Sequence, residues 1–299
     1  MSRVVIAGAS GFMGSYFARR FREDGDEVIT VGRSGVDVQW GDTEALDAAL
    51  EGADLLINLA GKSVNCRYTD KNKAAIFSSR LLTTGELGRS VESVAHPPKV
   101  WLNASTATIY RHADDRPQTD DEGQIGEGFS VNVATAWERE FFAHHRDDVR
   151  QVALRLAIVL GDGSALTPLL ALARLGLGGP QVGGKTPGGR QMFSWVHIDD
   201  VYRAIRFIQS DVTIDGHVNV SSPHPVRNRE LMATIRRIVG APFGLTLYRW
   251  MLEIGSFLIQ SETELLLKSR WVTPTRLLEE GFEFEHPELE EAIRSITGK

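Results

Sequence analysis

The sequence of 299 residues predicts an α/β protein built on a doubly wound parallel sheet of about seven strands, with a smaller, mostly helical C-terminal lobe. Two observations predict this class. Short apolar runs alternate with helical patterns from residue 4 to residue 159, as in proteins whose parallel strands are joined by helices. The first apolar run also leads directly into glycines at every third position, Gly8, Gly11 and Gly14.

The glycine-rich turn predicts a dinucleotide-binding site. Residues 4–6 form a β-branched run typical of a strand that is buried on both faces, and a helical period begins after the turn. Such a turn brings backbone N–H groups close to a pyrophosphate, and the helix N-terminus adds partial positive charge. An ordinary strand-to-helix turn is the alternative, because the spacing differs by one residue from G-x-G-x-x-G. The residues expected to contact the cofactor here are Gly8, Ser10, Gly11, Phe12, Met13 and Gly14.

The end of the second strand indicates which cofactor is bound. Residues 27–31 read as a strand that runs into Gly32, Arg33 and Ser34. NAD-specific sites carry an acidic residue near this point, whereas an arginine nearby accommodates the 2′-phosphate of NADP. Because no acid stands here, Arg33 and Ser34 favour NADP(H). An arginine that is merely solvated is the alternative.

The fourth strand, residues 54–61, contributes a second edge to the predicted site. It follows a short strand at 36–38 and a helix at 43–51. Open α/β sheets bind ligands at the carboxyl ends of their strands. Leu59, Ala60 and Gly61 are small or apolar there, so we expect them beside a ribose or the nicotinamide, with Lys62 at the rim.

The remaining elements divide the chain into two parts. We expect a helix at 70–94, a strand at 100–105, a loop at 113–128, a helix at 130–146 and a strand at 151–159. A helix at 164–175, a glycine-rich loop at 176–189, a strand at 191–196, a helix at 200–209 and a strand at 217–221 follow. Helical pieces complete the chain at 228–239, 246–259, 262–269, 274–280 and 287–296. The predicted dinucleotide-binding domain is 1–163, with 191–221 partly returning to it, and the lobe is 164–299.

Composition and charge exclude several function classes. Lys and Arg number 33 and Asp and Glu 39, so the net charge of −6 argues against nucleic-acid binding. No apolar run approaches the roughly 18 residues of a membrane span, and the chain enters a strand at once, without a signal peptide. The single cysteine, Cys66, fits a reducing compartment. The eight histidines lack metal-ligand spacing. We therefore expect a cytoplasmic, metal-free monomer or homodimer.

Several motifs together resemble the extended, atypical short-chain dehydrogenase/reductase superfamily, in its NAD-dependent epimerase/dehydratase-like branch. They are the glycine turn, Asn58-Leu-Ala-Gly61, Ser105-Thr-Ala-Thr-Ile-Tyr110 and Phe193-Ser-Trp-Val-His-Ile-Asp199. Lys268-Ser-Arg-Trp-Val-Thr-Pro274 resembles part of a small C-terminal domain of unassigned function in that branch. The resemblance implies a Rossmann-type fold with a C-terminal substrate lobe.

The resemblance also implies site roles. Arg33 would lie at the 2′-phosphate, Asp42 near the adenine and Ser105 along the cofactor. Thr106 takes the position of the hydroxyl that orients the substrate oxygen in the superfamily. We expect Thr106 and Tyr110 to be catalytic.

The chain departs from the superfamily at its catalytic pair. The superfamily carries Tyr-x-x-x-Lys early in the helix near residue 130, where the lysine lowers the tyrosine pKa so that it serves as a base. Here Ser130 and Ala134, or Phe129 and Val133, stand instead. A serine hydroxyl is too weak an acid to replace the tyrosine. Candidate replacements are Tyr110, Tyr68, Lys62, Arg111 and His112.

Substrate residues are predicted only in outline. Tyr68, Arg111 and His197 are candidates, although the pattern around His197 favours a helix cap that holds the two lobes together. Two functions remain open. The first is an NADP(H)-dependent oxidoreductase or epimerase-like enzyme that acts on a small carbonyl or hydroxyl compound. The second is a non-catalytic NADP(H)-binding sensor or partner-binding protein.

Overall fold

The centre of the protein is a seven-stranded sheet in which all neighbouring strands run parallel. The computed structural model describes residues 1–258 and 267–299. The strand order is β11-β6-β5-β4-β1-β2-β3, which confirms the predicted doubly wound sheet. The strands are β1 (Arg3–Ala7), β2 (Glu27–Gly32), β3 (Val38–Gln39), β4 (Leu55–Asn58), β5 (Val100–Thr106), β6 (Arg150–Leu156) and β11 (Gly216–Val220).

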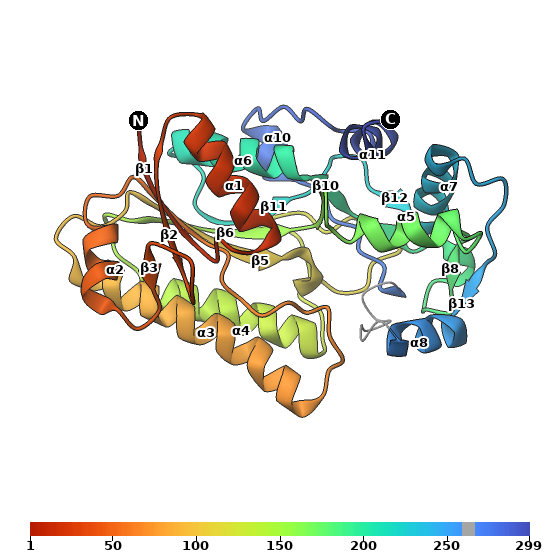
Figure 1. The fold of residues 1–299 in the computed structure, drawn as a ribbon, viewed down its shortest axis with the longest axis horizontal. Coiled ribbons are helices and arrows are strands. Elements are labelled where there is room, and N and C mark those ends of the chain that lie inside the picture. The colour runs from red at the N-terminus through yellow and green to blue at the C-terminus, as the bar shows by residue number, and fades with distance from the viewer. Residues whose placement is uncertain (259–266) are drawn as a thin grey trace.

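Helices cover both faces of this sheet (Figure 1). α1 (Phe12–Glu23) and α6 (Ile198–Ser210) lie on one face, and α2 (Thr43–Leu50), α3 (Asp70–Ser93) and α4 (Phe129–Ala143) lie on the other. Successive side chains of a strand point to opposite faces. Val4 and Ile6 of β1 therefore join the core under α1 and α6, whereas Val5 and Ala7 join the core over α2 and α3.

The strand order places a crevice beside β1. β2 and β3 lie on one side of β1, and the chain then crosses to β4 on its other side. In open α/β sheets ligands bind at such a switch in strand order, outside the carboxyl ends of the strands. The turns that follow β1, β2, β4 and β5 thus share one edge of the sheet.

The C-terminal lobe is held together by short two-stranded sheets and by a core of its own. Its helices, at the right of Figure 1, are α5 (Leu166–Arg174), α7 (Asn228–Val239), α8 (Arg249–Leu258) and α11 (Leu289–Thr297), whereas α10 (Thr275–Glu279) lies over the main sheet. The strand pairs are β7 (Ile158–Leu160) with β10 (Trp195–His197), β9 (Met192–Phe193) with β12 (Val226–Arg227), and β8 (Gln181–Val182) with β13 (Leu247–Tyr248).

The predicted single strand at 151–159 is wrong in one respect, because the chain changes sheets in its course. The N–H of Ala157 donates to Val220 O, and the next N–H, of Ile158, donates to Ser194 O. The ladder with β11 ends there and a new pairing with β10 begins. The predicted helix at 262–269 lies mostly outside the described residues. In the part of the chain that the structure describes, no helix combines the length and apolarity needed to cross a bilayer.

Candidate functional site

The glycine turn after β1 packs too tightly for any side chain at two positions. Gly8 has φ of 83°, and a Cβ there would lie 2.8 Å from the Leu59 carbonyl carbon. A Cβ on Gly14 would overlap the carbonyl oxygen of Gly8 and approach Ala9 Cα to 2.7 Å. The N–H of Gly11 donates to Gly8 O at 3.1 Å and closes the turn. The start of α1 is thereby pressed against the ends of β1 and β4.

The N-terminus of α1 carries no anion from the described part of the chain. Its N-cap is Gly11, and within the described residues no side chain caps this helix end. No acidic residue stands in the first turn, whereas Arg20 and Arg22 stand in the last. The first N–H groups of a helix have no partners within it and give that end partial positive charge. This end of α1 therefore suits an anionic ligand.

A cavity of about 460 Å³ lies beside the turn, between α1 and the loop after β2. Asp37 closes that loop, since its carboxylate accepts from the N–H and the hydroxyl of Thr30 at 2.8 and 2.7 Å. These hydrogen bonds lower the pKa of Asp37. Arg33 and Ser34 are exposed in the same loop. The cavity is lined by Ala9, Ser10, Ser15, Ala18, Arg22, Thr30, Gly35, Val36 and Asp37.

A buried amide network sets the path of the chain after β4. Asn58 accepts from the N–H of Ala60 at 3.0 Å and donates to Asn103 Oδ1 at 2.7 Å. Its amide nitrogen also donates to Thr84 Oγ1 on α3 at 2.9 Å. Each polar atom of this buried side chain thus has a protein partner, as burial requires. The network holds Leu59, Ala60 and Gly61 at the edge where the turn after β1 lies.

The end of β5 carries a buried charge network that the sequence did not predict. Ser105 donates to Glu138 Oε1 at 2.6 Å, and Arg155 holds both oxygens of Glu138 at 2.9 and 2.8 Å. Ser105 is therefore turned into the core. Thr106, one residue later, is half-buried and accepts from the N–H of Thr108 at 3.1 Å. A charged residue within an apolar strand, such as Arg155, is the signal that would have predicted a buried partner.

Tyr110 does not lie where it could exchange a proton with a ligand. It is 1% exposed, and its hydroxyl donates to Asn219 Oδ1 at 2.8 Å and accepts from Arg155 at 3.0 Å. Burial raises the pKa of Tyr110, which is the wrong direction for a base at neutral pH. The expectation that Tyr110 is catalytic is corrected accordingly. The residue packs and completes the network around Arg155.

The first turn of α4 meets a tyrosine from another element. Tyr68, in the loop between β4 and α3, places its hydroxyl 3.5 Å from Ser130 Oγ and its ring 4.8 Å from that of Phe129. Arg80 of α3 lies 4.9 Å over the ring of Trp137 of α4. Burial lowers the pKa of Arg80 to about 10, so that it remains cationic at neutral pH.

The other residues considered as replacements for the catalytic pair, Arg111, His112 and Lys62, are held by contacts within the protein. Arg111 holds both oxygens of Asp115 at 2.9 and 2.8 Å, so its charge is already paired. His112 accepts from the N–H of Ser269 at 3.1 Å and contacts Thr186 Oγ1 at 2.9 Å. The backbone of Lys62 is bound on both sides by α3, to Ser79 Oγ at 2.8 Å and to Arg80 at 3.0 Å.

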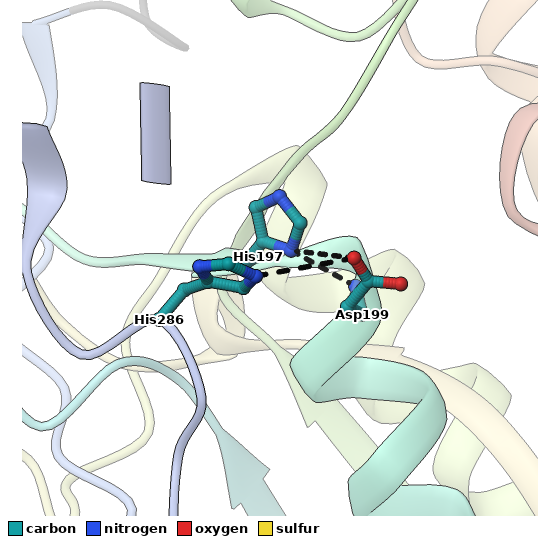
Figure 2. Close-up of side chains that lie close together, drawn as sticks. All are labelled: His197, Asp199 and His286. Atoms are coloured by element: carbon teal, nitrogen blue, oxygen red, sulfur yellow. Dashed lines mark hydrogen bonds and ion pairs between the residues drawn. The ribbon is translucent and has the colours of Figure 1, made fainter. Parts of the chain in front are cut away.

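His197, Asp199 and His286 form a compact group at the start of α6 (Figure 2). One nitrogen or oxygen atom from each lies within 4.8 Å of the others. His197 is 4% exposed, and burial lowers its pKa to about 4. Its Nδ1 accepts from the N–H of Asp199 at 3.1 Å, and its Nε2 lies 3.2 Å from Ser295 Oγ. Both nitrogens therefore have protein partners, and the group fits a helix cap between two lobes better than a metal or substrate site.

The sheet order, the glycine turn and the uncapped end of α1 define a nucleotide-binding protein of the Rossmann type. The model of the NAD dependent epimerase/dehydratase family matches residues 4–221, and the chain belongs to that family. Residues 249–296 match a domain of unknown function, DUF1731. The resemblance drawn from the sequence motifs is thereby confirmed.

Relatives share the whole length of the chain. Epimerase family protein YfhF of Bacillus subtilis is 30% identical and covers 98% of this chain and 97% of its own. The crystal structure of human epimerase family protein SDR39U1 (isoform 2) with NADPH has a TM-score of 0.87 at 28% identity, covering 99% of both chains. A nucleoside-diphosphate sugar epimerase of Corynebacterium glutamicum has a TM-score of 0.75 at 26% identity, covering 99% of this chain and 58% of that one.

Proposed function

We propose that this protein binds NADP(H) across the carboxyl edge of the sheet and uses it in an epimerase-like or oxidoreductase reaction. The observation that carries the proposal is the cradle formed by the glycine turn and the uncapped N-terminus of α1. A Cβ at Gly8 or Gly14 would fill the close packing that the turn needs, and the helix end has neither a cap nor an acid of its own among the described residues. A pyrophosphate satisfies such a helix end.

The proposed cofactor contacts follow the edge outward from this turn. Ser10, Gly11, Phe12 and Met13 surround the pyrophosphate position, and Arg33 with Ser34 would hold the 2′-phosphate. The exposed Arg33 next to the cavity, and the NADPH bound by the human relative, support NADP(H) over NAD(H). The remaining proposed contacts are Asp42, Leu59, Ala60, Gly61, Lys62 and Ser105.

Some of these contacts are constrained by the fold. Asp42 accepts from the N–H of Ala45 at 3.1 Å as the cap of α2, so we propose that it only borders the adenine. The hydroxyl of Ser105 is engaged by Glu138, so this residue would contribute its backbone. The small residues after β4 present no charge to the nicotinamide.

The chemistry requires a substrate oxygen near Thr106. When bound, the dinucleotide supplies a hydride acceptor or donor at nicotinamide C4. Thr106 ends β5 at the ligand edge and carries a hydroxyl that is half-buried. We propose that this hydroxyl orients the oxygen of a small carbonyl or hydroxyl substrate.

A second candidate function is an NADP(H)-binding sensor without turnover. It is favoured by α4, where Ser130 and the fully buried Ala134 stand in place of the usual tyrosine and lysine. A panel of small aldehydes and ketones separates the two candidates. Reduction of any member by NADPH supports the enzyme, whereas tight NADPH binding without reduction supports the sensor.

The proposed cofactor is tested by comparing the affinities for NADPH and NADH. We expect the wild type to prefer NADPH and Arg33→Ala to weaken NADPH binding by roughly tenfold or more, because a charge-assisted contact is lost. NADH binding should change little. Arg19→Ala, an exposed arginine on the far part of α1 that pairs with Glu23, is the matched control. Equal affinities of the wild type for the two cofactors would refute the assignment.

A further inference from the structure

We propose that Tyr68, from the loop between β4 and α3, is the proton donor and acceptor of this site, and that the charge of Arg80 of α3 activates it. The inference rests on the proposed function, because it names the acid–base group of that reaction. The two residues replace, from other elements, a pair that α4 lacks.

The location of the Tyr68 hydroxyl is the first argument. It lies 3.5 Å from Ser130 Oγ, at the first turn of α4, where related enzymes carry their tyrosine. A phenol is therefore present at this helix turn, although the helix itself does not provide it. Ser130 is within reach of a weak hydrogen bond that orients the phenol.

The setting of the Tyr68 ring is the second argument. Its edge meets Phe129 of α4 at a ring distance of 4.8 Å, and Phe129 meets Phe77 of α3 at 5.7 Å. Aromatic contacts in these T-shaped geometries are favourable. The phenol is thus held against the first turn of α4, whose Phe129 is itself packed on α3, as a group that transfers protons must be held.

The charge of Arg80 is the third argument. Its guanidinium is fixed by hydrogen bonds to Lys62 O at 3.0 Å and Ile76 O at 3.1 Å and by the ring of Trp137. An electrostatic interaction with Tyr68 favours the cationic form of Arg80 and raises its pKa against the effect of burial. The same interaction must favour the phenolate of Tyr68. A desolvated cation therefore supplies what a lysine on α4 would supply.

The proton step follows from this arrangement. In the oxidising direction the Tyr68 phenolate accepts the proton of a substrate hydroxyl, so that one O–H bond breaks and another forms. The electron pair left on the substrate oxygen becomes the second bond of a carbonyl as the hydride departs to the oxidised dinucleotide. In the reducing direction Tyr68 returns its proton to the new alkoxide. Thr106 contributes a hydrogen bond to the same oxygen.

Titration of the tyrosines tests the proposal without any substrate. The ultraviolet difference between wild type and Tyr68→Phe isolates one phenol, and we expect its pKa to lie below the ordinary value of about 10 because of its interaction with Arg80. Arg80→Met removes the guanidinium that lies over Trp137 but keeps an unbranched side chain, and it should return that titration to about 10 or above. Tyr248→Phe is the control for the loss of a phenol elsewhere, because Tyr248 is 55% exposed in the C-terminal lobe. A Tyr68 titration at or above 10 would overturn the proposal.

A second measurement separates proton transfer from a structural role. Tyr68→Phe should bind NADPH within about twofold of wild type but lose roughly 100-fold or more in the rate of NADPH-dependent reduction of small aldehydes. Retained turnover in Tyr68→Phe overturns this inference and leaves the proposed function intact. Failure of the wild type to bind NADPH removes the proposed function, while failure to reduce any aldehyde or ketone leaves only the sensor and overturns the role of Tyr68.

Discussion

The N-termini of α1 and α6 lie on the same face of the sheet, but among the described residues only the N-terminus of α6 is capped and carries acidic side chains. The N-terminus of α6 is capped by the side chain of His197, and Asp199 and Asp200 stand in its first turn. Asp200 also accepts hydrogen bonds from the N–H groups of Glu285 and His286 at 2.7 and 3.0 Å. α1 begins at a glycine, with no cap and no acid from the described residues.

The difference indicates which helix end serves packing and which serves a ligand. A side-chain cap stabilises a helix by about 1 kcal/mol, and acids in the first turn add to this. α6 has this stabilisation, and its Asp200 also binds the C-terminal segment at Glu285 and His286. α1 lacks this stabilisation from its own side chains, and a bound anion would supply it. The two helices also contact each other directly, since Tyr16 and Arg20 of α1 both donate to Asp199 of α6.

The largest expected effect on NADPH affinity comes from adding a side chain in the glycine turn at the N-terminus of α1. Gly14→Ala places a methyl group against the Gly8 carbonyl oxygen, so the turn must open. We expect NADPH affinity to fall by roughly 100-fold or more. Isothermal titration calorimetry measures the affinity, and thermal unfolding reports how much of the loss is a loss of folding. NADPH affinity close to that of the wild type in a folded Gly14→Ala protein would break the distinction between the two helix ends.

The burial of His197, the cap of α6, should affect the pH dependence of the free energy of unfolding. His197 has a pKa of about 4 in the folded protein, against about 6.5 when unfolded. The unfolded chain binds a proton first as the pH falls, so the free energy of unfolding should decrease from about pH 6.5 to about pH 4, by up to roughly 3 kcal/mol. Above pH 6.5 this contribution is fully present.

The matched variant for this test is His197→Asn. Asparagine is a good N-cap but does not titrate, so the slope between about pH 6.5 and 4 should flatten. Asp199 and Asp200, whose pKa values are raised by burial, are present in both proteins. Urea denaturation at several pH values measures it. Identical slopes in the two proteins would show that His197 is not buried in its neutral form.

The smallest expected effect on NADPH affinity comes from adding an acidic side chain near the N-terminus of α1 without altering the packing of the turn. Ser10 is exposed at the mouth of the turn, so Ser10→Asp should leave the melting temperature unchanged. The new charge should oppose the pyrophosphate and weaken NADPH binding by about tenfold. Ser10→Asn is the neutral control. If Ser10→Asp binds NADPH as tightly as Ser10→Asn, the anion does not lie at this helix end.

Much of the fold was predictable because its signals are local. The β-branched run of β1, the glycines after it and the apolar period of α1 lie within adjacent residues. The alternation of strands and helices then predicts the parallel sheet. The predicted strands at 151–159 and 191–196 were exceptions, because each is divided between two sheets by partners that lie far away in the sequence.

The candidate site was predicted less completely. The sequence could place Thr106 at a strand end, but it could not show that Ser105 beside it turns toward Glu138, or that Tyr110 is closed off by Asn219. For His197 the sequence favoured a helix cap over a substrate role, and the hydrogen bonds of the structure agree with the cap.

The sequence by itself determined that a strand, a tight glycine turn and a helix follow one another, since steric fit and hydrophobic period act between neighbours. It also determined that α4 lacks a tyrosine and a lysine. Only the tertiary structure decided what stands there instead. Tyr68 and Ser130 are 62 positions apart, and His197 and Ser295 are 98 apart. Contacts over such separations depend on how whole layers pack, and no local pattern in the chain encodes them.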